Sequence, residues 1–273
     1  MQIYAYDKNG DEVISHFAET KTTYFCPECH HPVRLRSGPF LRPHFFHLKN
    51  QAPCRLREKG ETHLQIQDKL LQLLPKNEAF LERRLPSINR IADVVWETQK
   101  LIFEVQVSFI SAEEVLARIS AYRSQGYEVV WILHKRRFLN YRVTAAELAL
   151  QTHTHYFTDI TEHGHGVFFD QFSYILGGVR GASLFLRPVD LSKPQQATPS
   201  PNLPPRLLKM RAPWTVSFAG DLLNSSHFSP RHLEKALALE ELEIQPRRRF
   251  SLIKKIKDTL KLLAYALLDT GTR

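Results

Sequence analysis

Cysteine is scarce in this chain of 273 residues, which has three, and long apolar runs are absent. A small and odd number of cysteines argues against a disulfide framework and against an oxidising compartment. No apolar run reaches the roughly 18 residues that a membrane-spanning helix needs, and the first residues do not have the pattern of a signal peptide. We therefore expect a cytoplasmic protein without an integral membrane segment.

Acidic residues are also in the minority. The chain has 28 Asp and Glu residues against 37 Lys and Arg residues, which gives a formal net charge of +9 at pH 7 and a pI near 9.5. This excess of positive charge favours an anionic partner, and nucleic acid is the simplest choice. The hydrophobic content of 43% is enough for one packed core domain with appendages.

Two carboxylates interrupt apolar runs that are typical of buried strands. Asp93 lies within residues 91–96 and Glu104 within residues 102–107, and a polar turn at 97–100 joins the two runs into a predicted β-hairpin. A carboxylate buried in such a strand costs several kcal/mol unless a partner neutralises it. The sequence therefore predicts a cation beside these two acids.

A divalent metal ion is one candidate for that cation. Gln106 shares the face of Glu104, because alternate residues of a strand point to the same side. Two carboxylates and an amide suit Mg²⁺ or Mn²⁺, and an ion held in this way is suited to the hydrolysis of phosphodiester bonds. We expect Asp93 and Glu104 to be the ligands. The alternative is that both acids face solvent and form cross-strand salt bridges with Arg83, Arg84 or Arg90.

The surrounding pattern predicts the order helix, three strands, helix, strand, and hence an α+β fold. The first helix is expected from Glu61 to Leu74 and the first strand from 79 to 85, before the hairpin. A second helix is expected from Ser111 to Gln125, because Ser111 and Glu114 have capping-box spacing. The continuous apolar run at 127–133 is typical of a central parallel strand.

Cysteine and histidine form two closely spaced pairs, Cys26 with Cys29 and His44 with His47. Two such pairs give the nitrogen and sulfur shell of a tetrahedral structural zinc site. With four protein ligands no position remains for water or substrate, so this zinc would stabilise a small module. Cys54 is an alternative ligand, although we expect it to be a buried free thiol. Without a metal ion, the cysteines would be small buried residues and the histidines part of an exposed hairpin.

Basic residues surround these two pairs. Beside a hydrolytic site, such residues predict contacts with the phosphate backbone of DNA. A solvated surface is the alternative for any basic run. The candidate DNA contacts are Arg34, Arg36, Arg42, Lys49, Arg55 and Arg57.

These motifs together resemble the competence protein CoiA family, and the segment around Asp93 and Glu104 is similar to the core of PD-(D/E)XK nucleases. The resemblance covers about residues 20 to 170. It is carried by Cys26-Pro27-Glu28-Cys29, His44-Phe45-Phe46-His47, Glu61 with His63, Arg90-Ile91-Ala92-Asp93, Glu104-Val105-Gln106-Val107-Ser108, Arg118, Tyr122 and Trp131-Ile132-Leu133.

The resemblance implies an α/β core of the restriction-endonuclease kind behind a zinc-ribbon-like module. It also implies a metal-dependent deoxyribonuclease that processes DNA taken up in natural transformation, with recombination proteins as further partners. Two rival functions stay open. One is a catalytically silent DNA-binding accessory of recombination, and the other is a protein-interaction scaffold.

The same resemblance implies roles for further residues. The third motif of these nucleases is usually E-x-K, and Gln106 stands in the lysine position, as it does in CoiA-like sequences. Gln106 would orient the attacking water, and the Val105 carbonyl would complete the metal shell. Glu61 matches an additional acidic residue of the superfamily and would assist, unless it serves only the dipole of the first helix.

Proline and composition divide the chain into four parts. Residues 1–58 are expected to be the zinc-binding β-rich module, 59–187 the nuclease-like core with an added hairpin, 188–213 a proline-rich linker, and 214–273 a helical basic region. A group of histidines in the core is assigned to a loop and not to a metal site: His153, His155, His163 and His165.

The pattern in the last part of the sequence predicts a basic amphipathic helix after Arg247-Arg248-Arg249. Such a helix would lie on a membrane, bind DNA, or dock on a partner protein or on the rest of its own chain.

Overall fold

The structure of the chain is a computed structural model, which describes residues 2–39, 41–48, 54, 59–200, 202–223, 230, 233–234 and 236–241. For residues 41, 42 and 176 it describes only the backbone. The chain divides into two compact units. The first unit takes in residues up to 109 together with 119–134 and 158–167, and the second takes in 110–118, 135–157 and the residues from 168 onward.

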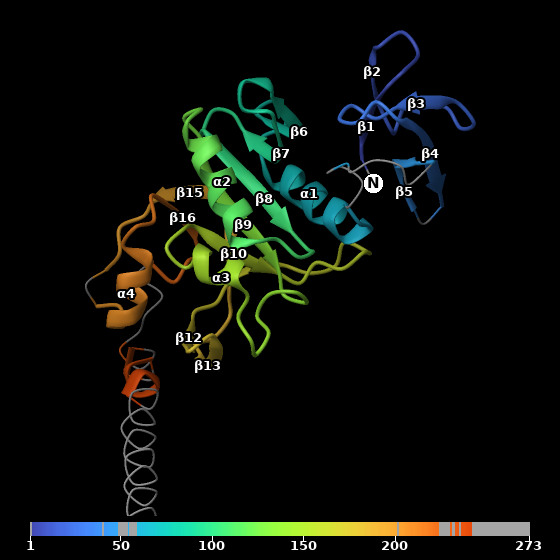
Figure 1. The fold of residues 1–273 in the computed structure, drawn as a ribbon. Helices are drawn as coiled ribbons and strands as arrows, with labels where there is room; N and C mark the ends of the chain where they lie inside the picture. Colours follow the sequence, from blue (N-terminus) through green and yellow to red (C-terminus); the bar gives the residue numbers. More distant parts are fainter. Residues whose placement is uncertain are drawn as a thin grey trace, which may run out of the picture. The chain divides into compact units, whose positions relative to one another are not determined.

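The first unit begins with a five-stranded antiparallel sheet in the order β2-β1-β3-β4-β5 (Figure 1). Alternate residues of its strands face a small core that contains Tyr24, Val33 and Phe45. The strand-rich character expected of the N-terminal residues is confirmed. The strands are β1 (Tyr4–Tyr6), β2 (Glu12–Ile14), β3 (Thr23–Phe25), β4 (Pro32–Gly38) and β5 (Leu41–His47).

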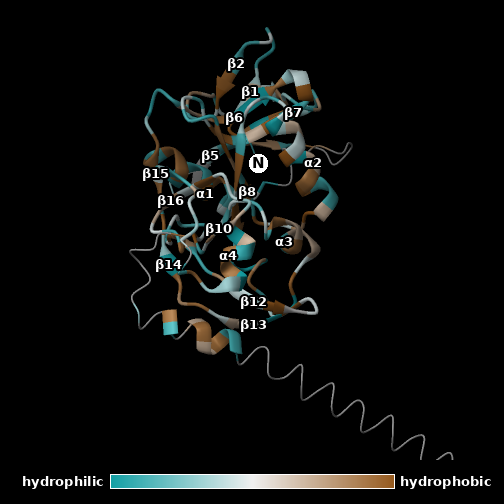
Figure 2. Ribbon diagram, turned by 90° about the vertical axis from the view of Figure 1, so that its left-hand side faces the viewer, coloured by the Kyte–Doolittle hydropathy of each residue, from teal (hydrophilic) through white to brown (hydrophobic). Residues whose placement is uncertain are grey.

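The same unit contains four neighbouring strands of a mixed sheet, β6 (Ala79–Leu85), β7 (Arg90–Trp96), β8 (Leu101–Gln106) and β9 (Glu128–His134). β6, β7 and β8 run antiparallel to one another, whereas β8 and β9 are parallel. Every residue of β8 is buried, as a nearly continuous apolar sequence requires. In Figure 2, β8 is mostly brown, the colour of hydrophobic residues.

Two helices accompany these strands. α1 (Glu61–Leu73) precedes β6 and packs against β6, β7 and β8 through an apolar face that includes Leu64 and Leu70. α2 (Ala112–Arg123) comes between β8 and β9, and the hydroxyl of Ser111 accepts the Glu114 N–H at its start. The predicted order of helix, three strands, helix, strand is therefore confirmed, and the fold is mixed α+β.

The second unit contains α3 (Ala145–Leu150), which begins with a capping box formed by Thr144 and Glu147, and α4 (Pro205–Arg211). Its strands form the run β14-β11-β10 and the pairs β12-β13 and β15-β16. β10 and β11 are neighbours in this run, and residues 159–167 connect them. The strands are β10 (His155–Thr158), β11 (Phe168–Asp170), β12 (Ser173–Leu176), β13 (Val179–Ser183), β14 (Arg187–Pro188), β15 (Asp190–Gln196) and β16 (Val216–Ala219).

The proline-rich stretch 188–213 is not a linker, contrary to expectation. It contains β15, which pairs with β16, and α4. Pro194 lies where the register of β15 shifts, and such an irregularity tolerates a residue without an N–H. Pro205 occupies the first position of α4, where the missing N–H has no partner within the helix.

The C-terminal region is only partly helical among the described residues. Residues 233–234 and 236–241 are helical, but β16 precedes them. The predicted basic helix after Arg249 lies outside the described residues. Within the described chain, no helix combines the length and apolar character needed to cross a membrane.

Candidate functional site

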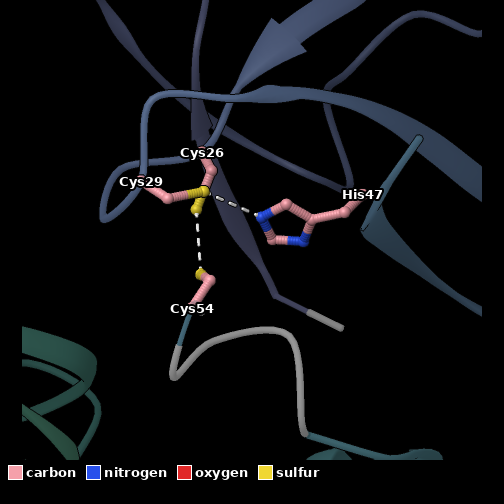
Figure 3. A group of neighbouring side chains, drawn as sticks. All are labelled: Cys26, Cys29, His47 and Cys54. Carbon is pink, nitrogen blue, oxygen red and sulfur yellow. Dashed lines mark hydrogen bonds between the residues drawn. The ribbon is translucent and has the colours of Figure 1, made fainter. Parts of the chain in front are cut away.

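Four potential metal ligands converge beside the N-terminal sheet. Cys26 and Cys29 lie in the turn after β3, His47 ends β5, and Cys54 comes later in the chain. Their ligand atoms all lie within 4.8 Å of one another. The sulfurs of Cys26 and Cys54 are 3.6 Å apart, and the sulfur of Cys29 is 3.2 Å from Nε2 of His47 (Figure 3). Three sulfurs and one imidazole nitrogen are a donor set of closed structural zinc sites.

His44 does not belong to this cluster, and Cys54 takes the place expected for it. Both histidines lie on β5, where His44 pairs with Arg36 and His47 with Val33. Residues three apart in a strand point to opposite faces, so β5 cannot direct both imidazoles at one ion. The prediction failed because it rested on the spacing of the two histidines, which did not show that both lie on a strand.

The surroundings shift the pKa values of the Cys26 and Cys29 thiols in opposite directions. Burial raises the pKa of the Cys26 thiol. Burial acts in the same direction on Cys29, but hydrogen bonds from the His31 backbone and from Cys26 outweigh it and lower the pKa of Cys29. Metal ligation requires thiolates, and only the shift of Cys29 favours one. The close approach of the four ligand atoms is what fits a structural zinc ion.

Asp93 on β7 is buried and accepts hydrogen bonds from several elements of the first unit. Its Oδ1 accepts from Nε2 of His63 at 3.1 Å and from Nε2 of Gln67 at 3.0 Å, and both donors lie on α1. Its Oδ2 accepts from the N–H of Val105 on β8 at 2.9 Å. These bonds fix the orientation of the carboxylate relative to both neighbouring elements.

Lys59 supplies a positive charge beside Asp93. Its Nζ lies 2.7 Å from Oδ1 of Asp93 and 3.0 Å from Oε1 of Glu82. Burial alone would raise the pKa of Asp93, but the charges of Lys59 and His63 hold that pKa well below its ordinary value. Burial also opposes the charge on Lys59, yet Asp93 and Glu82 raise the pKa of Lys59 above its usual range. Asp93 is therefore ionised and Lys59 protonated at neutral pH.

Glu104 on β8 is fully buried and lies near Asp93 in the sheet. Val94 and Phe103 are a cross-strand pair, and Asp93 and Glu104 are the next residues along the two strands. This register directs both carboxylates to the same face. The hydroxyl of Tyr122 donates to Oε1 of Glu104 at 2.7 Å. The alternative in which both acids face solvent is wrong, because both are buried.

Gln106, the last residue of β8, uses its amide in the following turn. Its Nε2 donates to the carbonyl oxygen of Ser108 at 2.9 Å. This bond holds the turn between β8 and α2. It also fixes the plane of the amide at the end of the strand that carries Glu104.

Glu61 is the first residue of α1. Its Oε1 accepts from Nε2 of Gln65 at 3.1 Å, whereas its Oε2 is buried without a hydrogen-bond partner among the described residues. Apart from the cysteine and histidine cluster, the described chain has no group of three or more Asp, Glu, His or Cys ligand atoms within 4.8 Å of one another. The structure thus directs Asp93 and Glu104 to one face but does not gather Glu61 with them.

The partners of Asp93 were not predicted from the sequence. His63 and Gln67 are four residues apart on α1 and therefore share one face of the helix, whereas Lys59 lies before the helix begins. Polar residues at this spacing beside apolar ones were the available signal. The contact between Tyr122 and Glu104 had no comparable signal, because it depends on how the helix packs on the sheet.

The candidate DNA contacts are only partly described. Arg34 and Arg36 are exposed and two residues apart on β4, so they share one face of the N-terminal sheet. The guanidinium of Arg36 lies 4.7 Å from the centre of the Phe46 ring. The backbone of Arg42 lies in β5, while Lys49, Arg55 and Arg57 are outside the described residues.

Comparison with models of protein families gave two matches. Residues 59–173 match the model of the competence protein CoiA nuclease-like domain, and residues 18–57 match the model of the competence protein CoiA N-terminal domain. The two matches together cover more than half of the chain, and they include the metal-ligand cluster and the Asp93 site. No curated protein and no solved structure matched.

Proposed function

This chain belongs to the competence protein CoiA family, and from that premise we propose that it binds DNA and hydrolyses phosphodiester bonds with Mg²⁺ or Mn²⁺. The pair of buried carboxylates, Asp93 and Glu104, at neighbouring register positions of β7 and β8 carries this proposal. Carboxylates are the ligands that hard divalent cations prefer. The buried Oε2 of Glu61, without a described hydrogen-bond partner, gives the proposal further support.

In the proposed site, Asp93 and Glu104 would hold the metal ion, with the carbonyl group of Val105 and assistance from Glu61. The ion would supply the polarisation of the phosphoryl group and the acidity of the bound water. Gln106 would orient the attacking water through its amide.

The partners of Asp93 have a separate role in this proposal. Lys59, His63 and Gln67 keep the carboxylate ionised and correctly oriented. Such preorganisation lowers the cost of assembling the site when metal ion and substrate bind.

The N-terminal sheet would contribute binding. Zn²⁺ held by Cys26, Cys29, His47 and Cys54 would stabilise this small module. Exposed arginines of β4 would contact the phosphate backbone of DNA, together with the other candidate contacts named above.

The biological setting is a further part of the proposal. A CoiA protein with these properties would act in the cytoplasm on DNA taken up in natural transformation, single-stranded or double-stranded, and would cooperate with recombination proteins. The family name supports the link to competence.

A second candidate function is DNA binding without cleavage. The contacts of Asp93 favour it, because Lys59 already neutralises the carboxylate at 2.7 Å. Gln106 also offers a neutral amide where a charged side chain would stabilise more negative charge. In this case the protein would assist recombination by holding DNA strands.

Cleavage of labelled single- and double-stranded DNA with Mg²⁺ or Mn²⁺ separates these functions. We compare the wild type with an Asp93→Ala, Glu104→Ala double variant whose zinc content is verified. A Glu113→Ala, Glu162→Ala variant is the matched control, because it removes two exposed carboxylates of the same charge. Metal-dependent cleavage by the wild type and the control, lost in the site variant, supports the nuclease. Binding without cleavage by all three proteins supports the silent DNA-binding function.

A further inference from the structure

Lys59 occupies an unusual place for a lysine. It lies two residues before the start of α1, and its side chain is only 11% exposed. Two carboxylates of the sheet hold its ammonium group, Asp93 at 2.7 Å and Glu82 at 3.0 Å. A buried ammonium group is costly unless carboxylates compensate it, so this placement needs an explanation.

Glu82 is built to hold Lys59 in position. It lies on β6 with a φ of +47°, a left-handed conformation that non-glycine residues seldom adopt. Its Oε2 accepts the backbone N–H of Ile3 at 3.3 Å, and its Oε1 accepts Lys59. Backbone strain that persists at a single residue often accompanies a functional constraint. The geometry thus directs the lysine toward Asp93.

The proposed reaction requires a cationic group that Gln106 does not provide. Hydrolysis forms a bond between a water oxygen and phosphorus and breaks the bond from phosphorus to one sugar oxygen. The water loses its proton to solvent, and the leaving sugar oxygen takes a proton from solvent. Negative charge grows on the phosphate oxygens in between, and fixed positive groups stabilise it. Gln106 is neutral, and its Nε2 donates to Ser108.

We propose that Lys59 is the cationic group of the phosphodiesterase site, with its ammonium beside Asp93 positioned to contact a non-bridging oxygen of the scissile phosphate. The inference rests on the proposed nuclease function and adds a residue to it. Lys59 keeps its proton throughout and contributes only charge. With a divalent ion bound at Asp93, the ammonium group of Lys59 would turn from this carboxylate toward the phosphate. The positive charge of Lys59, which precedes α1, thus takes the place of the lysine charge that Gln106 on β8 does not supply.

The test compares Lys59→Met with wild type in Mg²⁺-dependent cleavage of labelled DNA. Lys76→Met is the matched control, because Lys76 is exposed and its loss removes the same charge. We expect Lys59→Met to cleave about 10²-fold more slowly, while Mn²⁺ binding measured by electron paramagnetic resonance is retained. Lys76→Met should cleave like the wild type.

A purely structural lysine would also reduce cleavage when removed, so a rescue variant is needed. Gln106→Lys places an ammonium group on the face of β8 that carries Glu104. In the Lys59→Met background it should raise the cleavage rate at least about tenfold. A merely structural Lys59 would not be rescued in this way, because the charge at position 106 does not rebuild the contacts of Glu82 and Asp93. Failure of this rescue would overturn the inference.

The remaining outcomes are also decisive. Equal cleavage by Lys59→Met and wild type overturns the role of Lys59 but leaves the nuclease function standing. No cleavage by wild type with either metal ion overturns the nuclease function, and the role of Lys59 with it. If Lys59→Met does not fold, Lys59→Arg decides, because it retains the charge. A folded Lys59→Arg variant that does not cleave would contradict the proposal, and one that cleaves would support it.

Discussion

Asp93 and Glu104 are buried at neighbouring positions of two strands, yet the chain stabilises them differently. Asp93 is neutralised by the ammonium group of Lys59, whereas the hydroxyl of Tyr122 donates to Glu104. Lys59 brings a full positive charge to Asp93, whereas the Tyr122 hydroxyl is an uncharged donor. A divalent ion would therefore compete with the charge of Lys59 at Asp93. At Glu104 it would meet no competing charge from Tyr122.

The fourth ligand of the metal-ligand cluster is Cys54 and not the predicted His44. This difference leads to a direct prediction. Cys54→Ser should lower zinc retention, because a hydroxyl is a poor substitute for a thiolate ligand. His44→Gln should keep one zinc ion per folded chain, because His44 is not in the cluster. The measurement is the zinc content of the folded fraction after dialysis against a competing chelator.

The free energy of unfolding provides a control for the comparison of Cys54→Ser with His44→Gln. His44 is fully buried, so its replacement should lower the free energy of unfolding even though zinc is retained. Loss of zinc from a folded His44→Gln variant, together with retention in Cys54→Ser, would restore His44 as a ligand and contradict the observed cluster.

The strands and helices around the site were predictable because their sequences are locally consistent. β8 and β9 are nearly continuous apolar runs, and α1 has an apolar face of helical period. The buried carboxylates of these strands required a cation, and that requirement was correct for Asp93. The nature of the cation was not predictable, because Lys59 reaches Asp93 across 34 positions of the sequence through tertiary packing.

β15 and α4 escaped prediction for a different reason. Proline counts suggested a linker, but Pro194 and Pro205 sit where a strand and a helix tolerate them. Likewise, strand alternation on β5 decided which histidine joins the cluster, and the spacing of the two histidines did not reveal that they lie on a strand. The spacing of cysteines and histidines thus predicted a metal-binding cluster. Which residues belong to it depended on whether they lie on a strand or in a turn.

α4, β11 and the residues after β16 share a buried charged group in the second unit. The guanidinium of Arg211 lies 2.5 Å from Oδ1 of Asp170 and 3.5 Å from Oδ1 of Asp221. The hydroxyl of Tyr156 donates to the other oxygen of Asp221. One guanidinium thus faces two buried carboxylates. Burial and the charge of Asp170 therefore raise the pKa of Asp221 to about 7, although Arg211 opposes the shift.

This raised pKa predicts how Asp221 affects stability. Between its ordinary value of 3.8 and about 7, the unfolded chain has released the proton while the folded chain retains it. Rising pH therefore favours the unfolded state, by up to about 1.4 kcal/mol per pH unit. Asp221→Asn removes this titration, so the free energy of unfolding of wild type should fall relative to the variant as pH rises through this window.

Urea unfolding across that pH window checks the prediction. Tryptophan fluorescence is a suitable probe, because the Trp214 ring lies 3.7 Å from the Arg211 guanidinium. His155 is an internal control of opposite sign, since burial and the charge of Arg211 lower its pKa to about 4. Its contribution to stability is present above its ordinary pKa of 6.5 and is lost as pH falls toward 4. A wild type and Asp221→Asn pair with parallel pH curves would refute the role of Asp221.

The metal-ligand cluster and the Asp93 site are connected through β6 within the first unit. The guanidinium of Arg84 on β6 donates to the carbonyl oxygen of Pro27, inside the turn that carries Cys26 and Cys29. Two residues earlier on the same strand, Glu82 holds Lys59. A zinc ion bound by the cluster would therefore support a turn that contacts β6, the strand on which the position of Lys59 depends.

Zinc removal should consequently weaken the Asp93 site without unfolding the sheet that carries it. The cluster residues Cys26 and Cys54 belong to the core of the N-terminal sheet, so zinc-depleted protein should lose hydrogen-exchange protection in β3, β4 and β5. The buried strands β8 and β9 should stay protected. Mg²⁺-dependent cleavage should fall and return only when Zn²⁺ is restored, because thiolates are poor ligands for Mg²⁺. Full cleavage by zinc-free protein with unprotected β3 to β5 would show that the two sites are independent, whereas loss of protection in β8 and β9 as well would show that zinc stabilises the whole first unit.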